Sequence, residues 1–285
     1  MNRRQSLKTF AAAALAPVQL RAFAPARARF RPAICAYSFR DQLKDGSFTY
    51  ADLIRMAADL GADGIDLTTY WLADTKDETL FALKKLAYRC GISIYTIGVR
   101  ARMAQPTPEL QSAEVELVRK WLEVAQKLGA SHMRIFGGAI PKGATETQAI
   151  AMAVGTLQRC AVEAAVRGVT LGVEDDGGIT TNAGPTVEIV KKAESPWVGI
   201  NLDTGNFPSD PYAQIELCAP YATNVHFKSE VHTTAGNQPA DWPRILTILG
   251  NAGYRGYLAL EYESAVDPMG TVPKLIARMK ELIRA

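Results

Sequence analysis

Histidine and paired cysteine are both scarce in this chain of 285 residues. Three histidines, His132, His226 and His232, are too few for the multi-histidine zinc clusters of barrel-type endonucleases. The four cysteines are far apart and no C-x-x-C pair occurs, so neither a thiolate zinc site nor a disulfide framework is indicated. We expect the cysteines to be small core residues.

A surplus of basic charge is also missing once the first 28 residues are set apart. The whole chain has a net charge of +3, but residues 1–28 hold five basic residues and no acidic one. The remainder has 27 basic and 29 acidic residues, a net charge of −2. Binding to nucleic acid needs an excess of Lys and Arg on the folded domain, so we expect no nucleic acid partner.

No segment has the roughly 18 continuous apolar residues of a membrane span. The N-terminus has a shorter Ala/Leu run of a different kind. There Arg3 and Arg4 precede an Ala/Leu run too brief to span a bilayer, and small-x-small sites follow at residues 24–26 and 26–28. Residues 1–28 therefore resemble a twin-arginine export signal, although Ser6 replaces the usual Phe. We expect a periplasmic protein with no membrane span in its mature form, residues 29–285, a cytoplasmic location being the alternative.

No G-x-G-x-x-G motif follows the first apolar run, which argues against an open dinucleotide-binding sheet. Eight short β-rich runs instead alternate with amphipathic segments, several of which end in a glycine suited to a helix C-terminus. This α/β alternation predicts a single-domain (β/α)₈ TIM barrel. The predicted strands are residues 33–37, 64–67, 92–97, 132–136, 169–173, 198–202, 224–227 and 257–260.

The last four predicted strands each carry a potential metal ligand at the C-terminal end: Glu174, Asp203, His226 and Glu261. Barrel chemistry collects at these ends, so we expect the four side chains to meet in one mouth. Three close carboxylates repel one another unless a cation compensates them. Oxygen donors with one nitrogen favour Mn²⁺, with Mg²⁺, Co²⁺ or Zn²⁺ as alternatives. The competing interpretation is that the acids cap helices and the histidine is a core residue.

Other polar residues near these strand ends are candidates for binding substrate. Lys228 follows His226 by two residues and should point to the same side, where it can hold a substrate oxygen. Arg134 either pairs inside the barrel or reaches the substrate. We interpret Glu263 as a rim residue, and the neighbours of Glu174 at positions 175 and 176 as loop acids that bond nearby backbone.

Aromatic residues follow the first two predicted strands. Tyr37 and the pair Tyr70 and Trp71 can stack on a sugar face, with core packing as the alternative. His132 stands at the start of a strand, on the face of a barrel that serves stability, and we interpret it as structural.

Four segments, GVTLGVEDDGG, WVGINLDTGNF, NVHFKSE and GYRGYLALEYE, resemble the sugar phosphate isomerase/epimerase group of xylose isomerase-like TIM barrels. The similarity extends over residues 31–285. The resemblance implies that the four strand-end residues bind the metal, and that Glu174 and Glu261 are also the acid–base residues. Asn206 stands where epimerases have a substrate-binding histidine, and His232 where they have an arginine, so the substrate-binding residues differ.

This resemblance implies a carbohydrate substrate and a metal-dependent isomerase or epimerase. We expect a glutamate to remove a proton next to a chelated carbonyl, giving an enediolate. Elimination from the same intermediate would make the protein a lyase or dehydratase of keto-sugars or keto-glycosides. A non-catalytic sugar-binding barrel is a weaker alternative. Barrels of this group often pair, so a homo-oligomer is also an alternative to a monomer.

Overall fold

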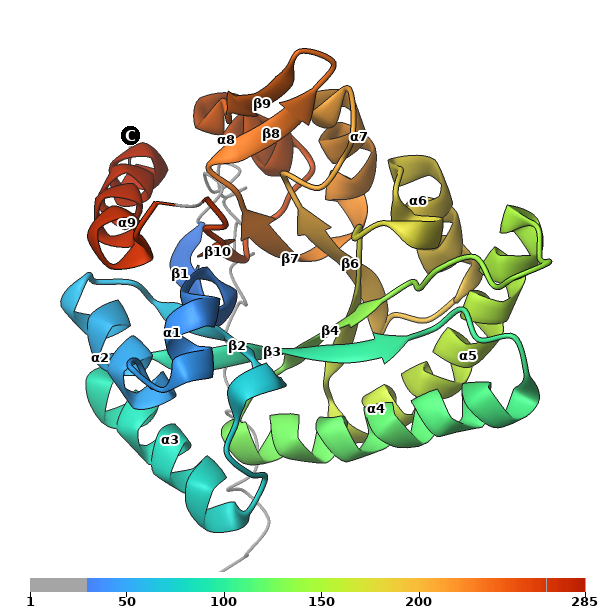
Figure 1. The fold of residues 1–285 in the computed structure, drawn as a ribbon, viewed down its shortest axis with the longest axis horizontal. Helices are drawn as coiled ribbons and strands as arrows, with labels where there is room; N and C mark the ends of the chain where they lie inside the picture. The colour runs from blue at the N-terminus through green and yellow to red at the C-terminus, as the bar shows by residue number, and fades with distance from the viewer. Residues whose placement is uncertain (1–29, 265, 285) are drawn as a thin grey trace, which may run out of the picture.

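The computed structural model describes residues 30–264 and 266–284, so the predicted export signal lies outside the described residues. The described chain is a single domain built on a closed parallel barrel with strand order β1-β10-β7-β6-β5-β4-β3-β2 (Figure 1). Helices alternate with the strands and surround them. The predicted (β/α)₈ TIM barrel is confirmed.

All eight barrel strands overlap the predicted ones, and β4 and β10 have the predicted bounds. The third strand runs to Arg102, well beyond its predicted end at Ile97. The strands are β1 Arg31–Cys35, β2 Gly64–Thr68, β3 Ser93–Arg102, β4 His132–Phe136, β5 Thr170–Glu174, β6 Val198–Asp203, β7 Ala222–Phe227 and β10 Tyr257–Leu260.

A short antiparallel hairpin, β8 Glu230–Thr233 and β9 Gly236–Pro239, follows β7 and was not predicted. Every residue of β9 is exposed, so the hairpin lacks the apolar alternation by which strands are recognised in a sequence. In Figure 1 the hairpin lies beside α7, outside the barrel.

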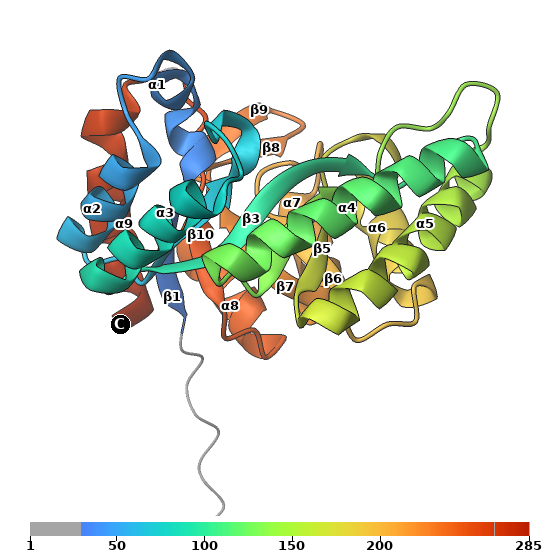
Figure 2. The same cartoon turned by 90° about the horizontal axis from the view of Figure 1, so that it is seen from below.

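The helices surround the barrel, and Figure 2 shows α3, α4 and α5 side by side along its outer surface. Their ends follow local sequence: a capping box at Thr145 begins α5, and Gly168, with φ of +64°, ends it. The helices are α1 Arg40–Asp45, α2 Tyr50–Asp59, α3 Asp77–Cys90, α4 Pro108–Leu128, α5 Glu146–Arg167, α6 Ala183–Lys192, α7 Pro211–Cys218, α8 Trp242–Asn251 and α9 Pro268–Arg284.

Among the described helices, α5 alone is long and apolar enough to cross a membrane. Eight of its residues are buried, and it packs against α4 and β5. A core helix of a barrel has the same length and composition, so this property does not distinguish α5 from a helix of a soluble domain.

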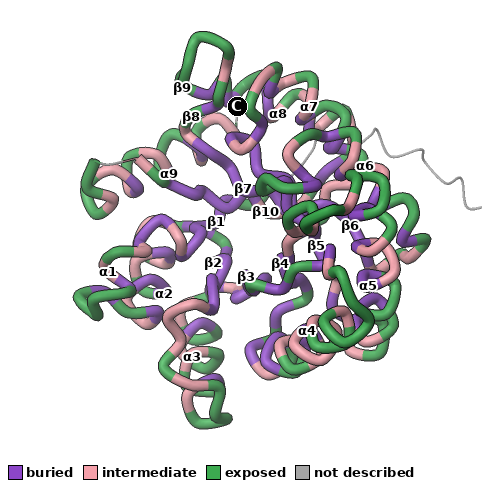
Figure 3. The backbone as a smooth tube through the Cα atoms, turned by 45° about the vertical axis from the view of Figure 1, so that its right-hand side comes forward, coloured by how far each residue is buried: buried purple, intermediate pink, exposed green. Residues whose placement is uncertain are grey.

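The two faces of the barrel strands bury different kinds of side chain. The large apolar core lies between the strands and the helices, whose outer surfaces are exposed (Figure 3). Inside the barrel the apolar cluster is small, consisting of Ala33, Cys35, Tyr95 and Ala259, with Tyr95 stacked on Tyr257. The remaining interior is polar, and this polar column leads to the mouth where the predicted ligands lie.

His132 is part of this polar interior, at the N-terminal end of β4. Its Nδ1 lies 2.7 Å from Thr96 Oγ1 and its Nε2 lies 3.2 Å from Thr223 Oγ1. Opposite it, a Cβ on Gly172 would lie 2.4 Å from Nε2, so glycine leaves the space that the ring occupies. These contacts agree with the structural role predicted for His132.

The burial of His132 gives a first testable expectation. Burial lowers the pKa of its imidazole to about 4, whereas an unfolded histidine titrates near 6.5. Between these values the unfolded chain binds the proton and the folded chain does not. The free energy of unfolding should therefore fall as the pH is lowered from 6.5 towards 4, by up to about 3 kcal/mol from this residue. Urea unfolding of wild type and His132→Gln at several pH values measures the difference.

The exposed His232 provides the control, because His232→Gln removes a histidine outside the barrel interior and is measured at the same pH values. Equal pH slopes for wild type and His132→Gln would show that His132 is not buried in its neutral form.

Candidate metal centre and active site

The C-terminal ends of four neighbouring strands bring the predicted ligands together. Glu174 ends β5, Asp203 ends β6, His226 lies in β7 and Glu261 directly follows β10. Asp203 and His226 are register partners of adjacent strands. One ligand atom from each of the four residues lies within 4.8 Å of the others, and all four residues are buried.

Two polar atoms of this group have no hydrogen-bond partner among the described residues, namely Asp203 Oδ2 and His226 Nδ1. Nδ1 lies 2.7 Å from Glu174 Oε1 and 3.2 Å from Glu261 Oε2, but neither contact has hydrogen-bond geometry. Buried polar atoms without partners are rare, and a cation bound between them would satisfy both. The oxygen and nitrogen donors therefore fit a divalent metal ion.

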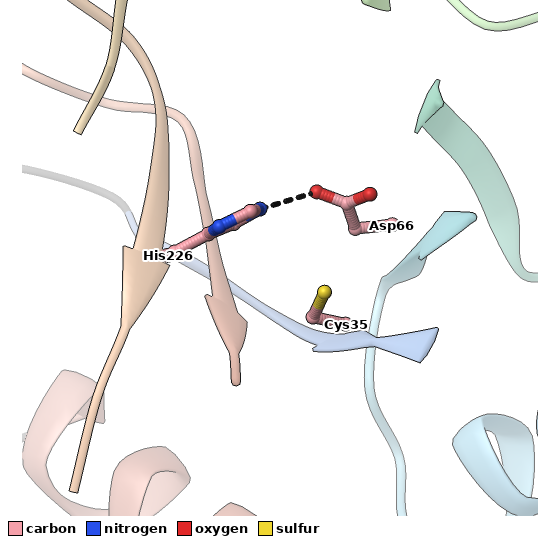
Figure 4. A group of neighbouring side chains, drawn as sticks. All are labelled: Cys35, Asp66 and His226. Atoms are coloured by element: carbon pink, nitrogen blue, oxygen red, sulfur yellow. Dashed lines mark hydrogen bonds and ion pairs between the residues drawn. The ribbon is translucent and has the colours of Figure 1, made fainter. Parts of the chain in front are cut away.

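Asp66, at the inner face of β2, fixes the orientation of the histidine. Its Oδ2 lies 2.8 Å from His226 Nε2, and Figure 4 shows the carboxylate facing that nitrogen. A carboxylate accepts hydrogen bonds, so Nε2 carries the donated proton and Nδ1 is the nitrogen directed at the three acids. Cys35 lies nearby in Figure 4, and its Sγ donates to Glu261 Oε1 at 3.4 Å. This cysteine is thus buried as predicted, yet it contacts the site.

A chain of buried amides connects these groups below the candidate metal ligands. Asn224 Nδ2 donates to Asp66 Oδ2 at 3.3 Å and to Asn201 Oδ1 at 2.7 Å. Asn201 Nδ2 in turn donates to Glu174 Oε1 at 2.9 Å. The tyrosine hydroxyl of Tyr95 donates to Asn224 Oδ1 at 3.1 Å. The network holds the carboxylates of positions 66 and 174 in fixed positions.

Arg134 supports the ligands from the side of β4. Its Nε lies 3.2 Å from Glu174 Oε2, and both side chains are buried. Its Nη1 donates to the hydroxyl of Tyr70 at 2.9 Å. A Cβ on Gly98 would lie 2.9 Å from Nη2, so the glycine in β3 leaves room for the guanidinium. The prediction left pairing and substrate contact open for Arg134, and its ion pair with Glu174 is the contact observed.

Lys228 is the second cation of the site. Its Nζ lies 2.8 Å from Glu261 Oε2 and 3.2 Å from Asp203 Oδ2, and it also bonds Glu263 at the rim. Burial opposes the charge of this lysine, but the three acids outweigh burial and hold its pKa well above the ordinary value. Lys228 is therefore an ammonium ion at neutral pH.

The acids of the site differ in their protonation behaviour. Burial raises the pKa of Asp203 well above its usual value, with the charge of Lys228 opposing the rise. Burial would likewise raise the pKa of Glu261, but the charges of His226 and Lys228 outweigh it and hold that pKa well below the usual range. Glu261 is thus an ionised carboxylate at neutral pH.

The two acids that follow Glu174 occupy different places. Asp175 is buried and its Oδ1 accepts the backbone N–H of Asp203 at 2.7 Å, a backbone contact to the neighbouring strand β6 and not to its own loop. Asp176 lines the cavity above the ligands. Neither residue belongs to the group of four ligand atoms.

A cavity of about 410 Å³ opens above the ligands at the C-terminal end of the barrel. Of the residues predicted to contact substrate, five line it: Tyr37, Tyr70, Arg134, Asn206 and Lys228. His232 lies in the hairpin instead, where its Nδ1 contacts Asn237 Oδ1 at 2.5 Å, and it lines an adjoining cavity. Trp71 lines neither of these two cavities, since it packs against Tyr37 and Tyr70 and borders an apolar hollow beside α2 and α3.

The position of Trp71 differs from that of the other predicted substrate-binding residues. Residues Thr69–Trp71 form a 3₁₀ turn after β2, which directs Tyr70 into the cavity and Trp71 away from it. The sequence prediction also missed Asp66, Arg100 and Arg102 as residues of the site. An aspartate within the apolar run Gly64-Ile65-Asp66-Leu67 was an available signal, because an acid inside a buried strand needs a polar partner.

Several solved structures share this fold at low sequence identity. D-psicose 3-epimerase from Clostridium cellulolyticum H10, with D-tagatose, is 20% identical, with a TM-score of 0.68 over 90% of this chain and 95% of that one. A probable 3-DHS dehydratase from Bacillus anthracis is 16% identical, with a TM-score of 0.67 over 90% and 99%. A xylose isomerase-like TIM barrel protein from Mycobacterium smegmatis, in complex with magnesium, is 18% identical, with a TM-score of 0.69 over 89% and 96%.

None of the curated proteins compared with this chain matches it. The match to a protein family covers most of the barrel, from residue 54 to residue 282, and includes all four metal-ligand candidates. The chain belongs to the xylose isomerase-like TIM barrel family.

Proposed function

We propose that this protein is a divalent-metal-dependent isomerase or epimerase of a sugar or sugar derivative, with Mn²⁺ as its ion. The observation that carries the proposal is the cluster of four buried ligand atoms, all within 4.8 Å of one another, below a cavity of about 410 Å³. A cavity of this size suits a small polyhydroxy compound. The epimerase among the structural neighbours supports the same reaction class by fold alone.

A bound divalent cation acts as a Lewis acid that polarises a carbonyl group and makes the neighbouring C–H acidic. The chain supplies the groups that move the proton. Glu174 and Glu261 come from the two outer strands of the four, β5 and β10, with β6 and β7 between them. One glutamate removes the proton from one face of the substrate. Return of a proton from the other face inverts the carbon, and return to the adjacent carbon isomerises the sugar.

The neighbours of each glutamate keep it in position for this exchange. Arg134 and Asn201 hold the two oxygens of Glu174, and Lys228 and Cys35 contact those of Glu261. Lys228, as an ammonium ion in the mouth, can also donate a hydrogen bond to an oxygen on which negative charge develops. Such preorganised groups are the means by which a site of this kind lowers a barrier to proton removal.

Hydrogen exchange tests the proposal. We expect protein loaded with Mn²⁺ to incorporate deuterium from D₂O into a ketose at one carbon next to the carbonyl, detected by NMR and mass spectrometry. Metal-free protein should give no exchange, and the addition of Mn²⁺ should restore it. A panel of neutral, phosphorylated and carboxylated ketoses identifies the substrate class. Absence of exchange across the panel by the metal-loaded protein would contradict the proposed reaction.

Elimination is the second candidate, and one observation favours it. A further cavity of about 260 Å³ adjoins the first, and the two share Asn206, Lys228, Glu261 and Glu263. A substrate placed across the shared residues would have room on the far side for a leaving group. The probable dehydratase among the structural neighbours is compatible with this reaction by fold alone. A new double bond or a released aglycone from a keto-glycoside, in place of deuterium at a retained stereocentre, would select elimination.

A further inference from the structure

The long strand β3 carries two arginines into the cavity that lies above the metal ligands. Arg100 and Arg102 both line this cavity. They are two residues apart at the C-terminal end of the strand, so their side chains leave the same face. In the closed barrel, β3 lies four strands from β7 in either direction, and therefore opposite His226. Figure 1 shows the length of β3 across the barrel.

The other two cations of the cavity are already paired. Arg134 forms its ion pair with Glu174, and Lys228 contacts three acids. Arg100 and Arg102 form no ion pair with any acid in the described part of the chain. Glu114 lies beside Arg102, but its carboxylate oxygens accept the backbone N–H of Arg102 and the side-chain amide of Gln105. The cavity thus has an acidic wall around the ligands and a basic wall at β3.

The basic wall is held in place by its neighbours. The guanidinium of Arg100 lies 3.8 Å from the centroid of the Tyr70 ring, and that ring hydroxyl is fixed by Arg134. Gly138, which has φ of +98°, lies against Arg102, and a Cβ there would be 3.4 Å from the Cβ of Arg102. A guanidinium held over a ring keeps its fork of donors available to a ligand.

We propose that Arg100 and Arg102 form an anion-binding subsite, and that the substrate carries a carboxylate or a phosphate on the carbons remote from its reacting end. A carboxylate or a phosphate can accept two hydrogen bonds from the planar guanidinium of an arginine and neutralise its positive charge. A neutral sugar can accept the hydrogen bonds but leaves that charge uncompensated. The assignment of the bound anion to the substrate rests on the proposed function. The subsite itself rests on the charges and positions of the two arginines.

Calorimetry on the metal-free protein tests the subsite without turnover, with inorganic phosphate and D-gluconate as probes. We expect at least one of them to bind the wild type, and Arg100→Gln or Arg102→Gln to weaken that binding by about 10- to 100-fold each. Arg100→Lys and Arg102→Lys should retain part of the affinity, because they keep the charge and lose the fork. Arg89→Gln, at an exposed position of α3 outside the cavity, is the matched control and should bind as the wild type does. Thermal unfolding of each variant shows that it is folded.

If only phosphate binds, the substrate is a sugar phosphate. If only gluconate binds, the substrate is a sugar acid. Binding of both probes supports a subsite that accepts either anion. Binding of neither anion to the wild type, or equal binding by wild type and both Gln variants, would overturn the proposal. Deuterium exchange into neutral ketoses is measured separately. Exchange without anion binding would therefore overturn the subsite while the proposed reaction stands.

Discussion

Replacing Glu261 or Glu174 by glutamine is expected to lower the rate of the proposed exchange by about 10²- to 10⁴-fold, the share that a positioned acid–base group contributes. Glutamine keeps the size of the side chain and one oxygen that can face a metal ion, but its amide cannot accept the proton. The neighbours that hold each side chain, Arg134 for Glu174 and Lys228 for Glu261, remain in place. Deuterium incorporation at saturating Mn²⁺ gives the rate.

Metal content must be measured alongside the rate, since both glutamates are also ligand candidates. Isothermal titration with Mn²⁺ separates a variant that no longer binds the ion from one that binds it and no longer moves protons. Glu216→Gln, which removes an exposed carboxylate on α7, is the control and should exchange as the wild type does. Two variants that bind Mn²⁺ and still exchange within tenfold of the wild-type rate would exclude both glutamates as the proton-transfer groups.

Asp66→Leu is expected to weaken metal binding by about 10- to 100-fold, although Asp66 is not one of the four candidate ligands at the strand ends. The carboxylate is the hydrogen-bond acceptor for His226 Nε2 at 2.8 Å. Leucine removes the acceptor, so the ring loses the contact that directs Nδ1 towards the acids. Competition with a chelator measures the Mn²⁺ affinity, and ¹⁵N NMR of His226 reports which ring nitrogen carries the proton.

Asp66→Asn separates orientation from charge. The amide oxygen of asparagine can still accept from Nε2 and from Asn224, so this variant should retain most of the affinity that the leucine variant loses. Unfolding of both metal-free variants shows how much stability each loses from the buried amide network. A leucine variant that binds Mn²⁺ as tightly as the wild type would mean that His226 keeps its orientation without Asp66.

The meeting of the four candidate ligands was predictable because each of them lies at or near the C-terminal end of a strand that the sequence marks clearly. Asp203 directly follows the apolar run Val198-Gly199-Ile200-Asn201-Leu202, and a parallel barrel brings such strand ends to one mouth. Four ligands on four consecutive strands are then neighbours for topological reasons alone. No knowledge of side-chain conformations was needed.

The basic wall was not predictable by the same reasoning. The β-rich run of the third strand ends at Ile97, and residues 98–102, with two arginines and a glycine, look like a loop. They continue the strand in the structure because β3 pairs again with β4 further on, where Arg102 is the register partner of Phe136 after an irregularity. Pairing between segments distant in the sequence decides the length of this strand, and the local sequence pattern does not show this pairing.

The aromatic pair after β2 shows a finer limit. Both Tyr70 and Trp71 follow the strand, and a sequence pattern cannot say which ring points inward when the backbone leaves the strand in a 3₁₀ turn. A shift of the turn by one residue would exchange the directions in which the two side chains point. The hairpin of β8 and β9 was missed for a related reason, since Val231 is its one buried residue and β9 has no buried residue to mark it as a strand.

The separation of a large apolar core outside the barrel strands from a mostly polar barrel interior has a consequence for redesign. Side chains that touch the helices supply most of the buried apolar surface, while the inward ones reach the cavity. A combinatorial library confined to inward positions near the mouth, such as Tyr37, Arg100 and Asn206, would vary what the protein accepts without disturbing the sheet–helix interface. The same scaffold could in this way be retargeted to a different small molecule while its melting temperature stays nearly constant.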